Sequence, residues 1–193
     1  MNVIFLDFDG VLNTYHYNSN EDIEKRIIIL SEICKEYNCK VVIEANAKDA
    51  IDEDTMEIYN NRVRFIFECF KKYGIDCIGR TPNVRRITSK CSYISMWKED
   101  EIRLYLFRHP EIEHYCIIDD NDYIDLEKVK DHLVETIYYS NNPEEEGLLE
   151  RHKEQVGEKL KLNNEIKVLA LKRNWLLSHF LVYYVHILRR GNI

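Results

Sequence analysis

Two pairs of acidic residues, far apart in the sequence, each follow a short apolar run. The run at 3–6 ends in Asp7-Phe8-Asp9-Gly10, and the run at 114–118 ends in Asp119-Asp120. Side chains alternate along a strand, so Asp7 and Asp9 can point to the same side as the chain leaves it, and Gly10 permits a sharp turn there. Converging carboxylates repel one another unless a cation holds them, and all-oxygen ligands favour Mg²⁺. These residues therefore predict a Mg²⁺ site that handles a phosphoryl group, with one carboxylate free to attack phosphorus.

The acidic pairs need a scaffold that brings them together, and the hydrophobic pattern predicts one. Apolar runs predict buried parallel strands at 3–6, 41–43, 75–78, 114–118 and 133–138. Amphipathic stretches between and after them predict helices at 20–37, 55–73, 95–108, 148–162 and 165–189. This alternation is typical of an α/β protein with a Rossmann-like open parallel sheet and helices on both faces. In such sheets the functional groups lie at the carboxyl ends of the strands, where both acidic pairs fall.

The acidic segments resemble the motifs of a known family. Residues 5–13 (FLDFDGVLN) look like the first motif of the haloacid dehalogenase (HAD) superfamily of phosphohydrolases, and 116–120 (CIIDD) like its acidic fourth motif. Residues 98–102 (KEDEI) resemble the basic third motif, which opens a helix. With Asn142-Pro143 and Gly147-Leu148 downstream, the order and spacing are similar to those of small HAD domains associated with RNA-repair proteins. The resemblance covers roughly residues 1–160 and implies a HAD-like phosphatase domain at 1–162.

The resemblance also implies a role for each motif residue. Asp7 would be the nucleophile that forms an aspartyl-phosphate, and Asp9 would protonate the leaving oxygen and then activate water. Mg²⁺ would be held by the Asp7 carboxylate, the Asp9 backbone carbonyl and one or both of Asp119 and Asp120. Lys98 would neutralise charge on the intermediate and brace the acids.

The second motif departs from the family pattern. The family places Ser or Thr just past the second strand to bind a phosphoryl oxygen, whereas this chain reads EANAK at 44–48. Asn46 could donate through its side-chain amide instead, or Lys48 could reach in; otherwise the site is weakened or inactive. We expect Gly10 of the first motif to help bind the substrate. Glu44 could join the acidic site or have a structural role.

The size of the substrate follows, within this family, from the presence or absence of a cap domain. About thirty residues separate Asp9 from the second predicted strand, and one helix accounts for most of them. The stretch 47–97 is likewise taken up by a helix, a short strand and a basic loop. We therefore expect a capless HAD domain with an open active site, as in members that commonly act on macromolecules.

Charge and family resemblance favour different macromolecules. The chain has 27 Lys and Arg against 34 Asp and Glu, a net charge of −7, and the excess of acid lies in residues 1–150. An acidic body favours a phosphoprotein substrate, with phosphotyrosine as one candidate, because nucleic-acid phosphates need Lys and Arg partners. The RNA-repair resemblance favours a nucleic-acid end phosphatase, and the altered second motif a pseudo-enzyme that serves as a binding module. Basic residues that could hold a second phosphate or an acidic partner segment lie at Arg80, Arg85, Arg86 and Lys90.

The C-terminal region, 163–193, is predicted to be a separate helical element. Its apolar stretch at 174–188 is flanked by basic residues and is shorter than the twenty or so residues that a membrane span needs. We expect no transmembrane span, and a helix that packs on the core or docks on a partner or a membrane surface. Six cysteines without a CxxC pair and the lack of a signal peptide favour a reduced, cytoplasmic protein, free or peripheral to a membrane.

Overall fold

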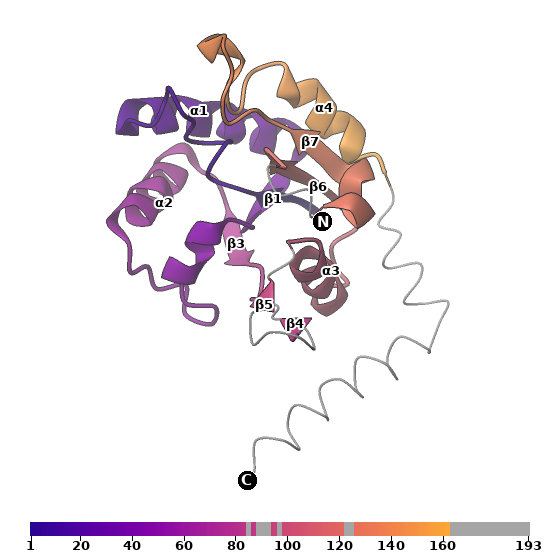
Figure 1. Cartoon of the computed structure of the whole chain (residues 1–193). Coiled ribbons are helices and arrows are strands. Elements are labelled where there is room, and N and C mark those ends of the chain that lie inside the picture. The colour runs from indigo at the N-terminus through magenta and orange to yellow at the C-terminus, as the bar shows by residue number, and fades with distance from the viewer. Residues whose placement is uncertain (84–85, 88–93, 96–97, 122–125, 163–193) are drawn as a thin grey trace.

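A computed structural model describes residues 1–83, 86–87, 94–95, 98–121 and 126–162 (Figure 1). Its centre is a five-stranded parallel sheet with the strand order β3-β2-β1-β6-β7. The strands are β1 (Asn2–Leu6), β2 (Cys39–Ile43), β3 (Cys77–Arg80), β6 (His114–Asp119) and β7 (Leu133–Glu135). A short antiparallel pair, β4 (Arg86–Ile87) and β5 (Ile94–Ser95), lies outside this sheet. The predicted α/β class with an open parallel sheet is confirmed.

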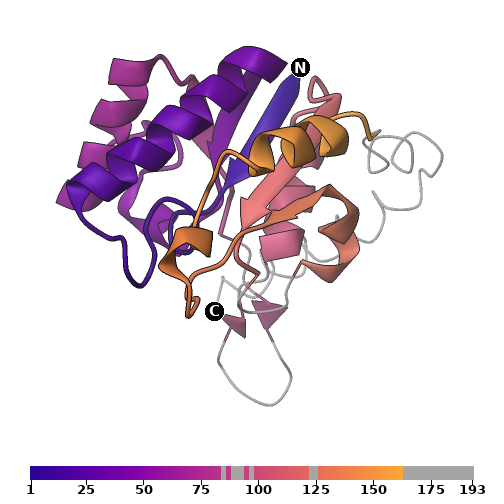
Figure 2. The ribbon, with the colours of Figure 1, turned by 90° about the horizontal axis from the view of Figure 1, so that it is seen from above.

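Helices cover both faces of the sheet, as predicted (Figures 1 and 2). Ile4 and Leu6 of β1 pack into a cluster with α1 (Asn20–Tyr37), α2 (Asn61–Tyr73) and α4 (His152–Lys159). Val3 and Phe5 point to the opposite face and pack with α3 (Lys98–Arg108) and the 3₁₀ helix η2 (Glu127–His132). Alternate side chains of a strand enter opposite faces, so a continuous apolar run is what a strand buried on both sides requires.

Helix α2 begins later than the hydrophobic pattern predicted. The Asn60 side chain accepts hydrogen bonds from the backbone N–H groups of Arg62 and Val63, so it caps a helix that starts at Asn61 rather than at residue 55. The preceding segment forms the 3₁₀ helix η1 (Asn46–Ala50) and then a turn. Asp52 fixes that turn because its carboxylate accepts from the backbone N–H groups of Asp54 and Thr55.

Other boundaries differ because local hydrogen bonds compete with the regular elements. The strand predicted at 133–138 ends at Glu135, and the carbonyls of Ile137 and Tyr138 then accept from Gly147 and Tyr15 instead of from the sheet. The strand predicted at 75–78 runs over 77–80, and the helix predicted at 148–162 is the shorter α4. The helix predicted at 95–108 is α3, described from Lys98, and the prediction was wrong at Ser95, which pairs with Arg86 in strand β5.

The predicted C-terminal element, 163–193, lies outside the described residues. Its packing or docking role, and the division of the chain at residue 162, stay predictions. Within the part of the chain that the structure describes, no helix combines the length and the apolar character that crossing a membrane would require.

Candidate active site

The parallel register of the sheet brings the two acidic pairs together. Leu6 of β1 lies opposite Ile118 of β6, and the Asp7 backbone N–H donates to the Ile118 carbonyl at 3.0 Å. The next residues, Asp7 after β1 and Asp119 at the end of β6, therefore lie side by side at this edge of the sheet. One carboxylate oxygen from each of Asp7, Asp119 and Asp120 lies within 4.8 Å of the others, with Asp7 and Asp119 buried.

These three carboxylates fit a divalent cation. Oxygen donors from several elements at this spacing are the ligand chemistry that Mg²⁺ uses in proteins, with water or phosphate oxygens completing its shell. Burial raises the pKa of Asp7 well above its ordinary value, and neighbouring Asp119 raises it further, while Lys98 opposes both. A bound cation would relieve this repulsion and favour the ionised carboxylate.

Lys98 contacts the acidic residues from α3, the helix on the sheet face that Val3 and Phe5 enter. It is the first residue of α3, and its Nζ donates to Asp7 and, at 2.6 Å, to Asp119 Oδ2. Burial disfavours the ammonium form, but the two carboxylates outweigh that penalty and raise the pKa of Lys98. The lysine therefore carries a fixed positive charge beside Asp7. Its expected part in catalysis stays a prediction.

Gly10 is required by the turn that follows β1. Its φ is +79°, and a Cβ there would lie 2.3 Å from Asp120 Oδ2, so a side chain would displace that carboxylate. The Gly10 carbonyl accepts from the Thr136 hydroxyl at 2.8 Å, and its N–H donates to the Asn13 carbonyl at 2.8 Å. The turn is thus tied to the end of β7 and held against the acidic group.

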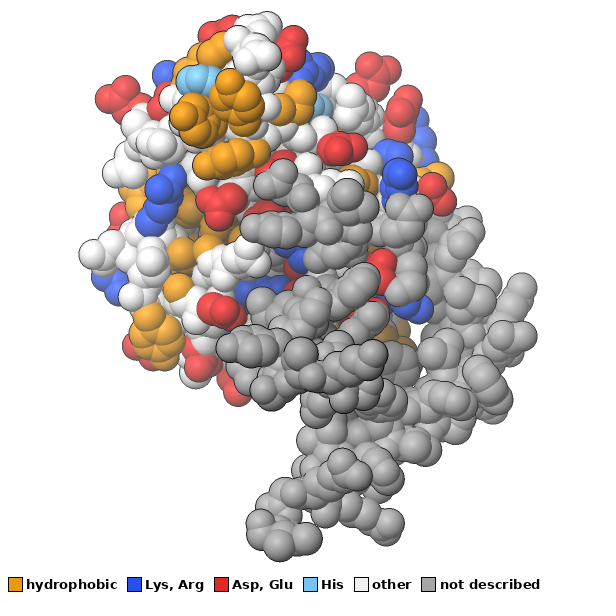
Figure 3. Space-filling model, viewed as in Figure 1, with side chains coloured by type: hydrophobic (Ala, Val, Ile, Leu, Met, Phe, Trp, Pro, Cys, Tyr) orange, Lys and Arg blue, Asp and Glu red, His pale blue; other side chains and the backbone are white. Residues whose placement is uncertain are grey.

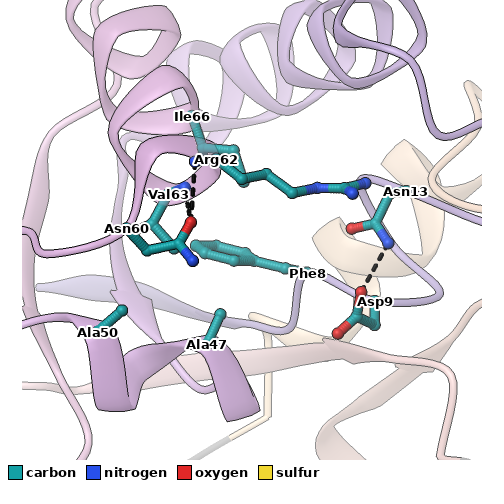
Figure 4. A pocket seen from close by; sticks show the side chains of 9 residues that line it. All are labelled: Phe8, Asp9, Asn13, Ala47, Ala50, Asn60, Arg62, Val63 and Ile66. Carbon is teal, nitrogen blue, oxygen red and sulfur yellow. Dashed lines mark hydrogen bonds between the residues drawn. The ribbon is translucent and has the colours of Figure 1, made fainter.

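Asp9 does not belong to the group of three carboxylates. Its side chain is exposed and accepts a hydrogen bond from Asn13 Nδ2 at 2.6 Å, at the rim of a pocket of about 150 Å³ (Figure 4). The Asp9 carboxyl is therefore not part of the candidate metal group, and its expected role in proton transfer stays a prediction. The ligand role predicted for its backbone carbonyl stays a prediction.

The pocket beside Asp9 was not predicted from the sequence. Its apolar wall comes from the turn after β1, from η1 and from α2, through Phe8, Ala47, Ala50, Val63 and Ile66. Asn13, Asn60 and Arg62 add polar groups at its rim. The sequence pattern had placed Asn60 and Arg62 inside a longer helix, which concealed that they stand at its first turn. Two adjacent asparagines before an amphipathic run were the signal for that start.

The residues of the altered second motif divide into a buried and an exposed part. Lys48 is 2% exposed, and its Nζ donates to Glu44 at 3.3 Å, to Thr81 Oγ1 at 3.0 Å and to Glu101. Burial raises the pKa of Glu44 to about 7, against the attraction of Lys48. Lys48 therefore does not reach a phosphoryl group, and Glu44 has the structural role. Asn46 is exposed at the start of η1, and its expected contact with substrate stays a prediction.

The basic residues predicted as a second anion site are only partly described. Arg80 lies in β3, where Nη1 donates to the Thr81 carbonyl at 3.0 Å and Nη2 lies 3.7 Å from Glu53. Arg85 and Lys90 are outside the described residues, and of Arg86 only the backbone in β4 is described. Over the described surface that Figure 3 shows, acidic and basic side chains are interspersed rather than separated by sign.

An exposed aromatic group follows the first motif. The rings of Tyr15, His16 and Tyr139 lie with centroids 4.9–5.6 Å apart, and Tyr15 and Tyr139 are more than half exposed. His16 Nδ1 lies 2.6 Å from buried Glu146, which fixes the ring. Together the three rings form an exposed aromatic surface.

Comparison with known proteins agrees with the motifs. Residues 3–140 match the family model described as the HAD domain in Swiss Army Knife RNA repair proteins. No curated protein and no solved structure is similar enough to this chain to match it. The match covers more than half of the chain and includes both acidic pairs and Lys98, so the chain belongs to the family of HAD domains found in Swiss Army Knife RNA repair proteins.

Proposed function

We propose that this protein is a Mg²⁺-dependent phosphomonoesterase that removes a terminal phosphate from a nucleic-acid end. The observation that carries the proposal is the convergence of Asp7, Asp119 and Asp120 at one edge of the sheet, where Lys98 donates to Asp7 and Asp119. The family is that of HAD domains in RNA repair proteins, which supports a phosphohydrolase and a nucleic-acid substrate.

The side chains account for each step of such a reaction. An Asp7 oxygen attacks phosphorus while the bond to the leaving oxygen breaks, and that oxygen takes a proton from Asp9. Asp9 then removes a proton from water, whose oxygen attacks phosphorus and releases Asp7 and inorganic phosphate. Lys98 holds Asp7 in place and offsets the negative charge near phosphorus. Asp7, Asp119 and Asp120 would hold Mg²⁺, which when bound would neutralise charge on the phosphoryl oxygens.

The phosphoprotein substrate expected from the net charge has less support. That expectation depended on the excess of Asp and Glu over Lys and Arg in residues 1–150, and a net charge does not describe the charges around the site itself. Acidic and basic side chains alternate on the described face in Figure 3, so a polyanion does not meet one continuous acidic field there. The family association supplies the only positive argument about substrate class, and it favours nucleic acid.

The test is a panel of phosphomonoesters. Oligonucleotides with a 3′- or 5′-phosphate, phosphotyrosine and phosphoserine peptides, and para-nitrophenyl phosphate would each be incubated with Mg²⁺ or EDTA. We expect Mg²⁺-dependent release of phosphate that is fastest from an oligonucleotide end and is abolished in Asp7→Asn. Asp131→Asn, a change of the same kind at an exposed position, serves as the matched control and should retain activity.

Two results would contradict the proposal in different ways. Faster release from a phosphopeptide than from any oligonucleotide would overturn the substrate class but not the chemistry. Failure to hydrolyse any member of the panel, with Mg²⁺ binding intact, would instead favour a binding module. The Glu44–Lys48 pair, standing where the family has a hydroxyl, would be the structural reason for such a loss.

A further inference from the structure

We infer that the pocket beside Asp9 is a subsite for the base of the terminal nucleotide, the one whose oxygen leaves in the reaction. The inference rests on the proposed function and adds to it which part of the substrate is recognised. It commits to an unpaired base, because a base that enters a pocket cannot remain stacked and paired in a duplex.

The first argument is size and polarity. The pocket has a volume of about 150 Å³, and a cavity of that volume with apolar walls accommodates benzene. Phe8, Val63 and Ile66 on one side and the two alanines of η1 on the other form the apolar part of its lining. Phe8 is 2% exposed and Val63 3%, so the surrounding core fixes these walls before a ligand arrives. The space therefore fits one flat ring.

The second argument is position. Asp9 lines the pocket, and Asp9 is the group expected to protonate the leaving oxygen. A ring bound there would belong to the leaving group and not to the phosphoryl group, which lies toward Asp7. Since a ribose separates the base from its phosphate, the sugar would lie over Asp9 and Asn13, with the base in the pocket beyond them.

The third argument is the polar rim, which suits a base better than a plain hydrocarbon ring. Asn60 Oδ1 is engaged in capping α2, so the amide group is oriented and its nitrogen is left as a donor on the pocket side (Figure 4). Asn13 Nδ2 is engaged with Asp9, which leaves the Asn13 amide oxygen as an acceptor. A donor and an acceptor at opposite ends of a ring-sized space match the carbonyl and amino groups of a base.

The fourth argument is charge. The Arg62 side chain passes from α2 across the pocket toward Asn13 in Figure 4, and its Nη2 donates to the Asn18 carbonyl at 3.4 Å. A guanidinium in this place can stack on the face of a bound ring. The walls and the guanidinium together would hold the base from two sides.

The experiment compares two oligonucleotides that differ only in the terminal base. One ends in a phosphorylated cytidine, the other in a phosphorylated abasic tetrahydrofuran residue, and kcat/KM is measured for each. We expect the base to raise kcat/KM by about tenfold to a hundredfold, the range for burying one large apolar group. Equal values for the two substrates would overturn the inference and leave the proposed function standing.

Two variants locate the effect. Arg62→Ala should lower kcat/KM for the cytidine end by about tenfold and change the abasic end much less, because the ring it stacks on is missing. An equal loss on both substrates would show that Arg62 binds the phosphate backbone and would contradict its role here. Arg64→Ala, the same change two residues along α2 and outside the pocket, is the matched control.

The second variant fills the pocket. Ala50→Leu should reduce the ratio of the two kcat/KM values to about one, because the added atoms occupy the space of the ring. An unchanged ratio in a folded Ala50→Leu protein would overturn the inference. Should Ala50→Leu fail to fold, the exposed Arg62 still decides the question. If the wild type hydrolyses para-nitrophenyl phosphate but no oligonucleotide, the proposed function itself has failed.

Discussion

Replacing Lys98 by Met is the most direct test of the acidic group. Lys98 is 8% exposed and is the ammonium that contacts both Asp7 and Asp119. Methionine keeps most of the side-chain volume but leaves two buried carboxylates without this partner. Breaking a buried ion pair by removing one member costs about 3–5 kcal/mol. For a domain of this size, that corresponds to a fall in Tm of about 6–20 °C.

Magnesium should partly reverse that loss. The cation binds the same carboxylates, and at a hundred times its Kd a ligand adds about 2.7 kcal/mol to the stability of the folded state. In the variant the carboxylates have lost their internal cation, so Mg²⁺ should raise the Tm more than it does in the wild type. The assay is thermal unfolding of both proteins in EDTA and over a series of Mg²⁺ concentrations.

A matched substitution shows whether the loss of Tm comes from the burial of the ion pair or from the loss of any ion pair. Lys72 also forms an ion pair, with Glu24 at 2.6 Å, but its side chain is 61% exposed. Exposed pairs contribute little because water already solvates both groups, so Lys72→Met should barely move the Tm and should not alter the response to Mg²⁺. If Lys98→Met unfolds at the same temperature as Lys72→Met, the reasoning about the buried acidic group is refuted.

Three further changes test other parts of the structure. Gly10→Ala places a Cβ 2.3 Å from the present Asp120 Oδ2 at a positive φ, so Mg²⁺ affinity, measured by calorimetry, should fall at least about tenfold. Asn13→Ala removes the 2.6 Å hydrogen bond to Asp9 and should lower kcat about tenfold, seen in steady-state kinetics; an unchanged kcat argues against Asp9 as the acid. Burial lowers the pKa of His152 to about 4, below its unfolded value near 6.5. Its stabilisation is therefore present above pH 6.5 and lost as pH falls toward 4, about 2 kcal/mol by pH 5; denaturant unfolding of His152→Gln should lack this component.

The amino-acid sequence was sufficient for the scaffold and for the acidic group. Apolar runs bounded by turns identified the five strands of the sheet, because a strand buried on both faces leaves no polar position inside it. The sequence places both acidic pairs at the carboxyl edge of the sheet, because each follows a predicted strand. That Asp7 lies beside Asp119 depends on β1 and β6 being neighbours, which the sheet order decides. Their neighbour Lys98 was found through family resemblance and not through its spacing.

Packing between elements distant in sequence decided which side chains of the second motif are buried and which are exposed. From the sequence alone, Lys48 and Asn46 are equally good candidates for binding a phosphoryl oxygen, because both lie just past the second strand. In the structure Lys48 is drawn inward because Glu44, Thr81 and Glu101, from three different elements, surround its ammonium group. A buried charge needs several partners at once, and the order of residues along the chain does not show that these partners converge.

The pocket beside Asp9 likewise exists only in three dimensions. Its walls come from three segments, and its shape depends on α2 beginning at Asn61 after the Asn60 cap. Hydrophobic periodicity locates the apolar face of a helix but not the residue at which competing side-chain hydrogen bonds start it. Residue types and their order thus predicted the carboxylates at the edge of the sheet. Long-range packing determined which of the nearby side chains are exposed to a substrate.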